Sequence, residues 1–396
     1  MRSFRIGSLF DIPIKLDLTF LLVLPVFAYL IGSQIEQLAE ILNQTMAAGI
    51  DVGSVTAGSM PWLLGLAAAV GLFVGVVLHE LGHSLTAQRY GFPIDSITLW
   101  LFGGIAAFSE MPENWKQELT IAVAGPIVSV LVGVGSYVLF LVTPESVDGV
   151  RLVLGYLAVL NVVLAGFNML PAFPMDGGRV LRALLARNQP YARATQQAAS
   201  VGKLFAILMG LFGLFAVNII LIGVAFFVYI AASNEAQQVT MKAAFQDVTV
   251  ADIMTPVDHL DTVDPGTTVA ELIRRMFTER HTGYPVVEEH GFGEDLVGLV
   301  TLTDAREVNE VERDAYTVED VMSTDLKTIT ANSDAMTAIE RMQEHDIGRL
   351  LVVDGDGQLV GLISRSDLMT AFNIIQESGA MISPEQPRPA SGGPYQ

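Results

Sequence analysis

Cysteine is absent from this chain of 396 residues, which excludes disulfide bonds and thiolate metal ligands. Lysine is scarce as well, with five residues, and no cluster of Lys and Arg stands out. Binding to nucleic-acid phosphates needs such clusters, so no nucleic-acid partner is expected. The net charge of −20 makes the surface acidic. Many acids beside few lysines are typical of halophile proteins, although ordinary surface charge gives the same pattern.

Charge of either sign is sparse in the first part of the chain. Met1–Ser233 contains 13 acids and 11 bases, a net charge of −2, whereas Asn234–Gln396 contains 29 acids and 11 bases, a net charge of −18. The sequence therefore predicts a multi-pass α-helical membrane domain over 1–233, followed by an acidic soluble part. Met1–Asp17 lacks a short apolar core with a cleavage site, so we interpret it as a segment that precedes the membrane.

About six transmembrane helices are predicted from the charge-free stretches, since a spanning helix needs about 20 mostly apolar residues. They cover Leu18–Ile35, Val52–His79, Leu119–Pro144, Leu152–Met175, Ala194–Phe215 and Val217–Ala232. The last charge-free stretch, Leu204–Asn234, is long for one helix and tight for two. The weakly polar lead-in Ala194–Lys203 makes the last two spans possible. Gly210 and Gly213 would let this pair pack closely, and Lys203 would lie within the fifth helix, facing protein or water.

The orientation follows from the Lys and Arg residues, which favour the cytoplasmic side of a membrane. Bases precede the first helix, flank the loop after the second and fill the segment after the fourth, whereas Glu36–Met60 has none. We therefore predict a protein of the cell membrane with a cytoplasmic N-terminus. With six helices the soluble part is cytoplasmic too, and with five it would lie outside.

The motif His79-Glu80-Leu81-Gly82-His83 closes the second apolar stretch. On a helix, positions i and i+4 share one face, so His79 and His83 can bind one metal ion together. Glu80 can act as the base toward water at that ion. The alternative is a chance match at a helix end, but ionisable groups at membrane depth are costly and usually functional.

A third protein ligand is expected, because a hydrolytic zinc ion usually has three of them and a water molecule. Asp176 is the best candidate, since Pro171 and Pro174 break the fourth helix just before it and two glycines follow it. Alternatively, Asp176 simply caps a helix that starts near Gly177. Three acids are weaker candidates for the ligand, because they belong to a polar loop in which charges are normally solvated: Glu110, Glu113 and Glu118.

Asn168 is a polar residue near the end of the fourth apolar stretch. Its amide could donate a hydrogen bond to a developing oxyanion during catalysis. A hydrogen bond between two membrane helices would explain the residue equally well.

The HExxH motif followed by Asn168–Arg179 resembles the site-2 protease family of intramembrane zinc metalloproteases, and Phe102-Gly103-Gly104 and Ala124-Gly125-Pro126 match it too. The resemblance covers most of 2–235. It implies one Zn²⁺ held by His79, His83 and Asp176, with Glu80 as the catalytic base. It also implies that Ile94–Phe108 forms a hairpin-like element beside the site, and that the substrate is a transmembrane helix of another protein.

The acidic part contains an internal repeat. Val250–Thr255 matches Val318–Ser323, and Leu296–Asp304 matches Leu359–Asp367. Each copy has the pattern helix, strand, strand, helix, with apolar runs typical of strands. The expected boundaries are a linker over 234–247, copies over 248–308 and 309–377, and a disordered tail over 378–396, which is rich in Pro, Gly and Ser.

This repeat resembles a tandem pair of CBS domains, which adds a soluble α/β module to the membrane domain. The resemblance implies homodimerisation and binding of AMP, ATP or another adenosyl ligand. By position, four residues would contact the phosphate and ribose: Thr301, Asp304, Ser364 and Asp367. Alternatively, these hydroxyl and carboxylate groups only cap the helices that follow them.

The leading hypothesis is a zinc-dependent intramembrane endopeptidase, regulated through its cytoplasmic CBS pair. A nucleotide-gated channel or transporter is the alternative from another class. Few polar residues lie in the predicted helices apart from the His, Glu and Asp set, which disfavours an ion path. A catalytically silent scaffold with a relic metal site is a third hypothesis.

Overall fold

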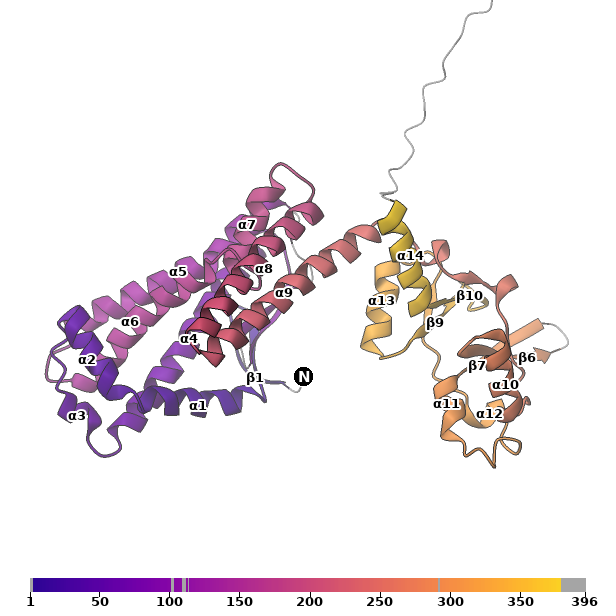
Figure 1. Cartoon of the computed structure of the whole chain (residues 1–396), viewed down its shortest axis with the longest axis horizontal. Helices are drawn as coiled ribbons and strands as arrows, with labels where there is room; N and C mark the ends of the chain where they lie inside the picture. Colours follow the sequence, from indigo (N-terminus) through magenta and orange to yellow (C-terminus); the bar gives the residue numbers. More distant parts are fainter. Residues whose placement is uncertain (1–2, 101–102, 109–111, 113, 291–292, 379–396) are drawn as a thin grey trace, which may run out of the picture. The chain divides into compact units, whose positions relative to one another are not determined.

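A computed structural model of the chain describes residues 3–100, 103–108, 112, 114–290 and 293–378. The chain divides into two compact units, Met1–Val239 and Thr240–Gln396 (Figure 1). The division agrees with the change in charge and hydropathy along the sequence. Each unit is considered by itself below.

The first unit is a bundle of long apolar helices joined by short turns. Its helices are α1 (Phe20–Gly32), α2 (Ile35–Met46), α3 (Val52–Thr56), α4 (Met60–Arg89), α5 (Trp115–Val142), α6 (Asp148–Asn168), α7 (Asp176–Ala186), α8 (Tyr191–Phe215) and α9 (Ile219–Ala244). Five of these are long and apolar enough to cross a membrane, or six if the bent pair α1–α2 counts as one span. The prediction of about six transmembrane helices is confirmed.

The first predicted helix differs from the structure in its course. Instead of one span over Leu18–Ile35, the chain forms α1 and α2 with a bend of 62° between them. The cause is local, because α2 is amphipathic and carries Glu36 and Glu40, which are exposed. Here α1 packs very closely on α4, since a Cβ built on Gly65 would lie 2.8 Å from the Cα of Gly32.

The last two helices confirm the predicted division of the long apolar stretch. α8 and α9 pack at Gly213, where an added Cβ would lie 3.1 Å from the backbone nitrogen of Ile222. Lys203 lies in α8, with its ammonium group 5.9 Å from the ring centre of Tyr229. α9 continues to Ala244, so most of the expected linker over 234–247 is helical. Its Glu, Ala and Gln residues are good helix formers, which explains the extension.

A four-stranded sheet, β1 (Ser3–Leu9), β2 (Ile12–Asp17), β3 (Ile94–Trp100) and β4 (Gly103–Phe108), packs beside α4. β2 and β3 are parallel, and the outer pairs are antiparallel. The hairpin predicted over Ile94–Phe108 is confirmed, although Phe102 lies outside the described residues. The N-terminal hairpin was not predicted. Ile12 of β2 and Ile97 of β3 are fully buried against Leu81, which lies within the HExxH motif.

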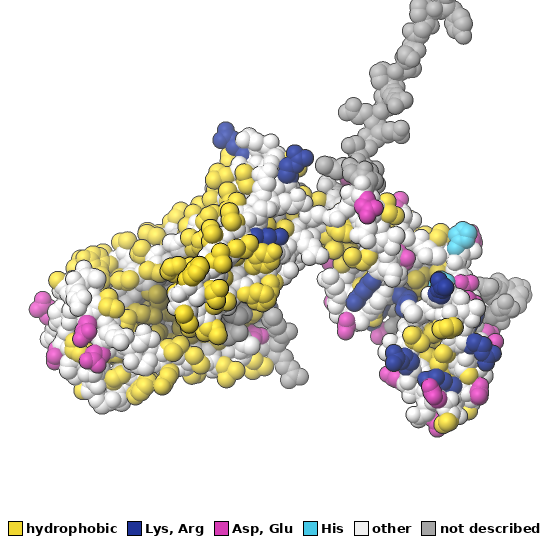
Figure 2. All heavy atoms as spheres, viewed as in Figure 1, with side chains coloured by type: hydrophobic (Ala, Val, Ile, Leu, Met, Phe, Trp, Pro, Cys, Tyr) yellow, Lys and Arg dark blue, Asp and Glu magenta, His cyan; other side chains and the backbone are white. Residues whose placement is uncertain are grey.

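The surface of the first unit is that of a membrane protein. Figure 2 shows hydrophobic side chains over its helices, with Asp and Glu at the end where α2 and α3 lie and Lys and Arg at the end where α7 lies. Large exposed apolar residues include Leu22, Leu131 and Phe215, with 73%, 63% and 84% of their surface accessible. Such a continuous apolar surface needs a lipid environment.

The second unit is a pair of small α/β repeats, which confirms the predicted helix–strand–strand–helix pattern. The first copy contains α10 (Val269–Glu279), β6 (Gly283–His290), β7 (Gly293–Thr301) and α11 (Leu302–Glu307). The second contains α13 (Ala335–Glu344), β9 (Arg349–Val353), β10 (Leu359–Ser364) and α14 (Arg365–Ser378). The shorter elements are η1 (Val250–Asp252), β5 (Thr255–Pro256), η2 (Val257–His259), α12 (Val318–Val321) and β8 (Thr328–Thr330).

The two repeats exchange their leading segments. β5, which precedes the first repeat, pairs with β10 of the second, and Ser323 forms a bridge with Leu299 of the first. The side chain of Met254 packs on Gly361, and that of Met322 packs on Gly298 at the equivalent place. These reciprocal contacts explain why the Asp-apolar-Met and Val-Gly-Leu segments recur in both copies. The predicted disordered tail lies outside the described residues apart from Ser378, which ends α14.

Candidate metal centre

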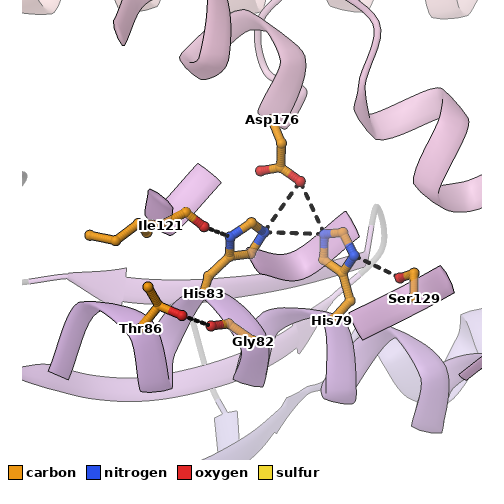
Figure 3. A network of polar contacts seen from close by, with 7 residues as sticks. All are labelled: His79, Gly82, His83, Thr86, Ile121, Ser129 and Asp176. Atoms are coloured by element: carbon orange, nitrogen blue, oxygen red, sulfur yellow. Dashed lines mark hydrogen bonds and ion pairs between the residues drawn. The ribbon is translucent and has the colours of Figure 1, made fainter. Parts of the chain in front are cut away.

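Three buried side chains from two helices converge inside the first unit (Figure 3). His79 and His83 lie one turn apart on α4, and Asp176 is the first residue of α7. Asp176 Oδ2 lies 3.1 Å from His79 Nε2 and 3.2 Å from His83 Nε2, and the two nitrogens are 3.2 Å apart. The three residues are only 4%, 3% and 8% exposed, so they meet in an apolar interior.

Asp176 reaches the histidines because the chain turns back between α6 and α7. α6 ends at Asn168, as the prolines at 171 and 174 predicted, and α7 starts only at Asp176. Gly177 and Gly178 pack against the backbone of this turn, and a Cβ on Gly178 would lie 2.7 Å from the nitrogen of Phe173. Met175 rather than Asp176 takes the N-cap position of α7, and in the described part of the chain the Asp176 carboxylate contacts the two histidines.

Both imidazole rings are oriented from behind by α5. His83 Nδ1 lies 2.7 Å from the carbonyl oxygen of Ile121, and His79 Nδ1 lies 2.8 Å from Ser129 Oγ. A carbonyl can only accept, so His83 Nδ1 carries a proton and the Nε2 of the neutral ring presents a lone pair. If His79 donates to Ser129 in the same way, its Nε2 also presents a lone pair, as metal-binding histidines do.

Gly125 of α5 keeps the space between the donor atoms open. A Cβ built on Gly125 would lie 2.8 Å from His79 Nε2 and even closer to His83 Nε2. Any larger residue would therefore occupy the place where the donors converge. The Ala-Gly-Pro segment thus has a steric reason for its glycine.

The donor set fits a zinc ion. Tetrahedral bonds of about 2.0–2.1 Å place neighbouring donor atoms about 3.3–3.4 Å apart. The observed separations of 3.1–3.2 Å are close to that value. Two neutral imidazoles and a carboxylate facing one another without intervening protons repel each other unless a cation lies between them. These residues could therefore hold one metal ion and leave a fourth position for water or substrate.

Glu80 follows His79 on α4 and is half-buried. It is the residue next to the first histidine donor and lies on the same helix, within one turn of His83. Asn168 is the last residue of α6 and is half-buried. The described contacts do not join its amide to the donor group, so its oxyanion role stays a prediction.

The weaker ligand candidates lie elsewhere. Glu110 and Glu113 are outside the described residues. Glu118 does not belong to the donor group among the residues that the structure describes, and the expectation that its charge is solvated in a loop is wrong. It lies on α5, is 4% exposed and forms an ion pair of 2.6 Å with Arg182. Neither this pair nor the role of Ser129 was anticipated from the sequence.

The second unit contains a cavity of about 820 Å³, and Thr301 and Asp304 are among the residues that line it. Within the described residues, Ser364 and Asp367 are not part of its lining. All four residues form capping boxes: Asp304 Oδ2 accepts from Thr301 Oγ1 at 2.7 Å, and Asp367 Oδ2 accepts from Ser364 Oγ at 2.6 Å. The structure therefore shows that both pairs cap helices, and that a cavity lies beside the Thr301–Asp304 pair.

Comparisons with known proteins agree with this arrangement. The model of peptidase family M50 matches residues 67–211, and the CBS domain model matches residues 250–310 and 318–374. The chain is 35% identical over 374 residues to Zinc metalloprotease MJ0392 of Methanocaldococcus jannaschii, covering 94% of this chain and 97% of that protein. It is 33% identical over 337 residues to Putative zinc metalloprotease Rip3 of Mycobacterium tuberculosis, covering 81% and 84%.

Among solved structures, a site-2 protease from Methanocaldococcus jannaschii is 39% identical and covers 59% of this chain and 95% of that chain, with a TM-score of 0.42. The family assignment rests on the match to MJ0392, which extends over 94% of this chain. The chain is thus a member of peptidase family M50, the site-2 proteases, and is a multi-pass zinc metalloprotease with a tandem pair of CBS domains.

Proposed function

We propose that this protein cleaves transmembrane segments of other membrane proteins, using one zinc ion held by His79, His83 and Asp176. The observation that carries this proposal is the convergence of three donor atoms within 4.8 Å of one another in a bundle of apolar helices. A zinc ion bound there acts as a Lewis acid on the scissile carbonyl and lowers the pKa of water.

Glu80 is the proposed catalytic base. Its position beside the two histidines on α4 allows its carboxylate to accept a proton from the attacking water and to pass it to the leaving amine. Asn168 is proposed to donate a hydrogen bond to the oxyanion, since it ends the helix that leads into the Asp176 turn.

The substrate must be extended before it can be cut, because a helix hides its peptide bonds in internal hydrogen bonds. β4 is the last strand of the sheet formed by the described residues, and the sheet packs on Leu81 of the HExxH motif. We propose that an unwound substrate segment pairs with this strand next to the metal centre. Deletion of Phe102–Gly104 should then impair cleavage while zinc content stays unchanged, and unaltered cleavage would refute the pairing.

The decisive test of the reaction uses purified full-length protein and a co-reconstituted single-span protein. Glu80→Gln should reduce cleavage by about 10²–10⁴-fold and leave zinc content unchanged. Glu40→Gln is the matched control, because Glu40 is exposed on α2 of the same unit. Retained cleavage in Glu80→Gln would remove this residue from the mechanism. Wild-type protein with zinc and no cleavage of any single-span protein would indicate a silent scaffold.

The cavity beside Thr301 and Asp304 is proposed to bind an adenosine nucleotide, with the module also mediating homodimerisation. Its lining includes three bases, Arg306, Lys327 and Arg349, which could bind phosphate groups. Titration calorimetry with AMP and ATP tests the proposal, and a change in cleavage rate on saturation would establish regulation. No heat of binding, with the fold intact, would refute nucleotide binding.

The N-terminus and the CBS pair are proposed to be cytoplasmic. The accumulation of Lys and Arg at the α7 end of the first unit, opposite the acidic end at α2 and α3, supports this orientation (Figure 2). Because the chain has no cysteine, single introduced cysteines can test it. Glu145→Cys should react with a membrane-impermeant maleimide in intact cells, and Asn188→Cys only after permeabilisation. The reverse pattern would invert the topology.

A further inference from the structure

A fully buried arginine joins three helices near the metal centre. Arg182 of α7 is 1% exposed and lies between the rings of Phe173 and Tyr191, 5.0 and 4.9 Å from their centres. Its Nε and Nη2 each lie 2.6 Å from Glu118 Oε1 on α5, and its Nη1 lies 2.5 Å from Glu235 Oε1 on α9. We call Arg182, Glu118 and Glu235 the arginine clamp.

The clamp differs from the other buried arginine of the same unit. Arg151 is 7% exposed and donates to main-chain carbonyls, those of Ala48 and Thr143, at 2.6–3.0 Å. These carbonyls follow the ends of α2 and α5, where unpaired oxygens need donors anyway. Arg182 instead contacts carboxylates of two other helices. Glu118 lies in the low-dielectric interior, where the attraction is strong, and Glu235 is partly exposed.

The helix that carries Asp176, α7, and the helix that orients both histidines, α5, meet at the clamp. α7 carries Asp176 at its first residue, about 9 Å from Arg182 along a rigid helix. α5 carries Glu118, and one turn later Ile121, whose carbonyl orients His83. Because α7 follows a non-helical turn, its position along α5 is not set by a continuous helix. The Arg182–Glu118 ion pair joins α7 to α5 at this place.

The third member places α9 in the same network. Glu235 lies in the part of α9 that precedes the end of the first unit, and α9 continues to Ala244. In the second unit, Met241, Ala244 and Phe245 pack in the core of the second repeat. Within the first unit, Glu235 thus joins α9 to Arg182.

We propose that Arg182 is a positioning residue of the metal centre, which holds Asp176 at the spacing that zinc requires and makes that spacing depend on α9 through Glu235. The proposal rests on the metal site argued above. Arg182→Lys keeps the charge but loses the planar fork that reaches two carboxylates. Residues that orient metal ligands typically change metal affinity by 10–100-fold when they are replaced.

The test uses full-length protein in detergent, with zinc affinity measured by chelator competition and donor geometry by the visible spectrum of the Co²⁺-loaded protein. Arg182→Lys should weaken zinc binding about 10-fold and shift the cobalt bands. Glu235→Gln, whose side chain is 28% exposed, should weaken it by about threefold. Arg151→Lys is the control for a buried arginine with a structural role, and it should lower the thermal midpoint without changing zinc affinity or the spectrum.

The clamp is refuted as a positioning device if Arg182→Lys and Glu235→Gln keep wild-type zinc affinity and cobalt spectrum, whatever their thermal midpoints. If Arg182→Lys does not fold, Glu235→Gln decides by the same two measurements. Absence of zinc from the wild-type protein would instead refute the proposed metal site, so the two failures are distinguishable.

Discussion

The metal centre and the Thr301–Asp304 pair each contain a buried or half-buried aspartate, but the two carboxylates have different kinds of partner. In the metal centre, donor atoms from α4 and α7 face one another at 3.1–3.2 Å. His79 and Asp176 lie 97 positions apart in the chain. In the second unit, the carboxylate of Asp304 accepts hydrogen bonds from its neighbour Thr301, three positions away. In the first set the polar atoms converge from distant parts of the chain, whereas in the second two near neighbours form their own hydrogen bonds.

This difference shows when a motif indicates a ligand. A polar pair that forms its own hydrogen bonds stabilises a helix start without any ligand, and the chain contains further pairs of this kind at Thr249–Asp252 and Thr317–Asp320. Converging acceptors in an apolar interior are unstable without a cation. In the first unit, the polar residues themselves therefore indicate a bound cation. In the second unit, a ligand is indicated only by the cavity beside Thr301 and Asp304.

The largest expected effect is a difference in zinc content between substitutions of Asp176 and Asp304. Asp176→Ala should abolish zinc binding and cleavage, because it removes a proposed ligand, whereas Asp304→Ala should leave zinc content unchanged. Metal analysis of the two purified proteins measures the difference. Zinc retained in full by Asp176→Ala would show that the carboxylate is not a ligand.

Ser129→Ala should have a smaller effect on the same site. The substitution removes the hydroxyl that lies 2.8 Å from His79 Nδ1, so the ring loses its partner while all three donors remain. Zinc affinity should fall about 10-fold in chelator competition. Ser136→Ala is a matched control, because Ser136 is also a buried serine of α5. Equal effects of the two substitutions would contradict an orienting role.

Two further substitutions compare the helix cap that lines the cavity, at Thr301, with the equivalent cap at Ser364. Thr301→Ala and Ser364→Ala should each destabilise the second unit by about 1 kcal/mol, since each removes an N-cap hydroxyl. Only Thr301→Ala should also weaken AMP binding, because only its pair lines the cavity among the described residues. Calorimetric unfolding and nucleotide titration give the two values. Equal loss of nucleotide affinity would place a ligand at both caps.

The smallest expected effect is a pH dependence of the stability of the second unit that arises from the Thr249–Asp252 cap. The side-chain hydrogen bond from Thr249, with a backbone bond from the same residue, lowers the pKa of Asp252 below its usual range. A carboxylate whose pKa is lower in the folded than in the unfolded protein stabilises the fold at pH values above the unfolded pKa of about 3.9. This contribution is lost as the pH falls through the folded pKa. Thr249→Val should therefore destabilise the second unit at pH 7, with a difference that shrinks below about pH 4 in calorimetry. A constant difference would exclude this linkage.

Much of the fold and the donor set could be predicted, because their signals are local or chemically restrictive. Charge-free stretches indicate membrane helices, and HExxH needs a third ligand that only an acid could supply in a part of the chain without further His or Cys. The bend between α1 and α2 escaped prediction because Leu18–Ile35 is long enough for one apolar span, and Glu36 and Glu40 lie just beyond it. The N-terminal hairpin escaped prediction because its sheet is completed by pairing with β3, a contact between distant segments that leaves no local pattern.

The supporting residues could not be predicted for a different reason. Ser129 is an ordinary small polar residue in an apolar helix, and only the folded arrangement of α4 and α5 gives it a partner. In the sequence, Arg182 looks like one of several bases after the fourth apolar stretch, and its partners lie 64 and 53 positions away. Glu118 seemed solvated for the same reason. Distant pairs of charges leave no local pattern.

The central claim is that His79, His83 and Asp176 hold one zinc ion. X-ray absorption at the zinc edge of the purified full-length protein tests it most directly. We predict one zinc ion per chain, with scattering from two imidazole rings and oxygen ligands, and loss of the imidazole signal together with the metal in a variant that lacks both histidines. A zinc-free protein, or a zinc ion without imidazole neighbours, would contradict the assignment.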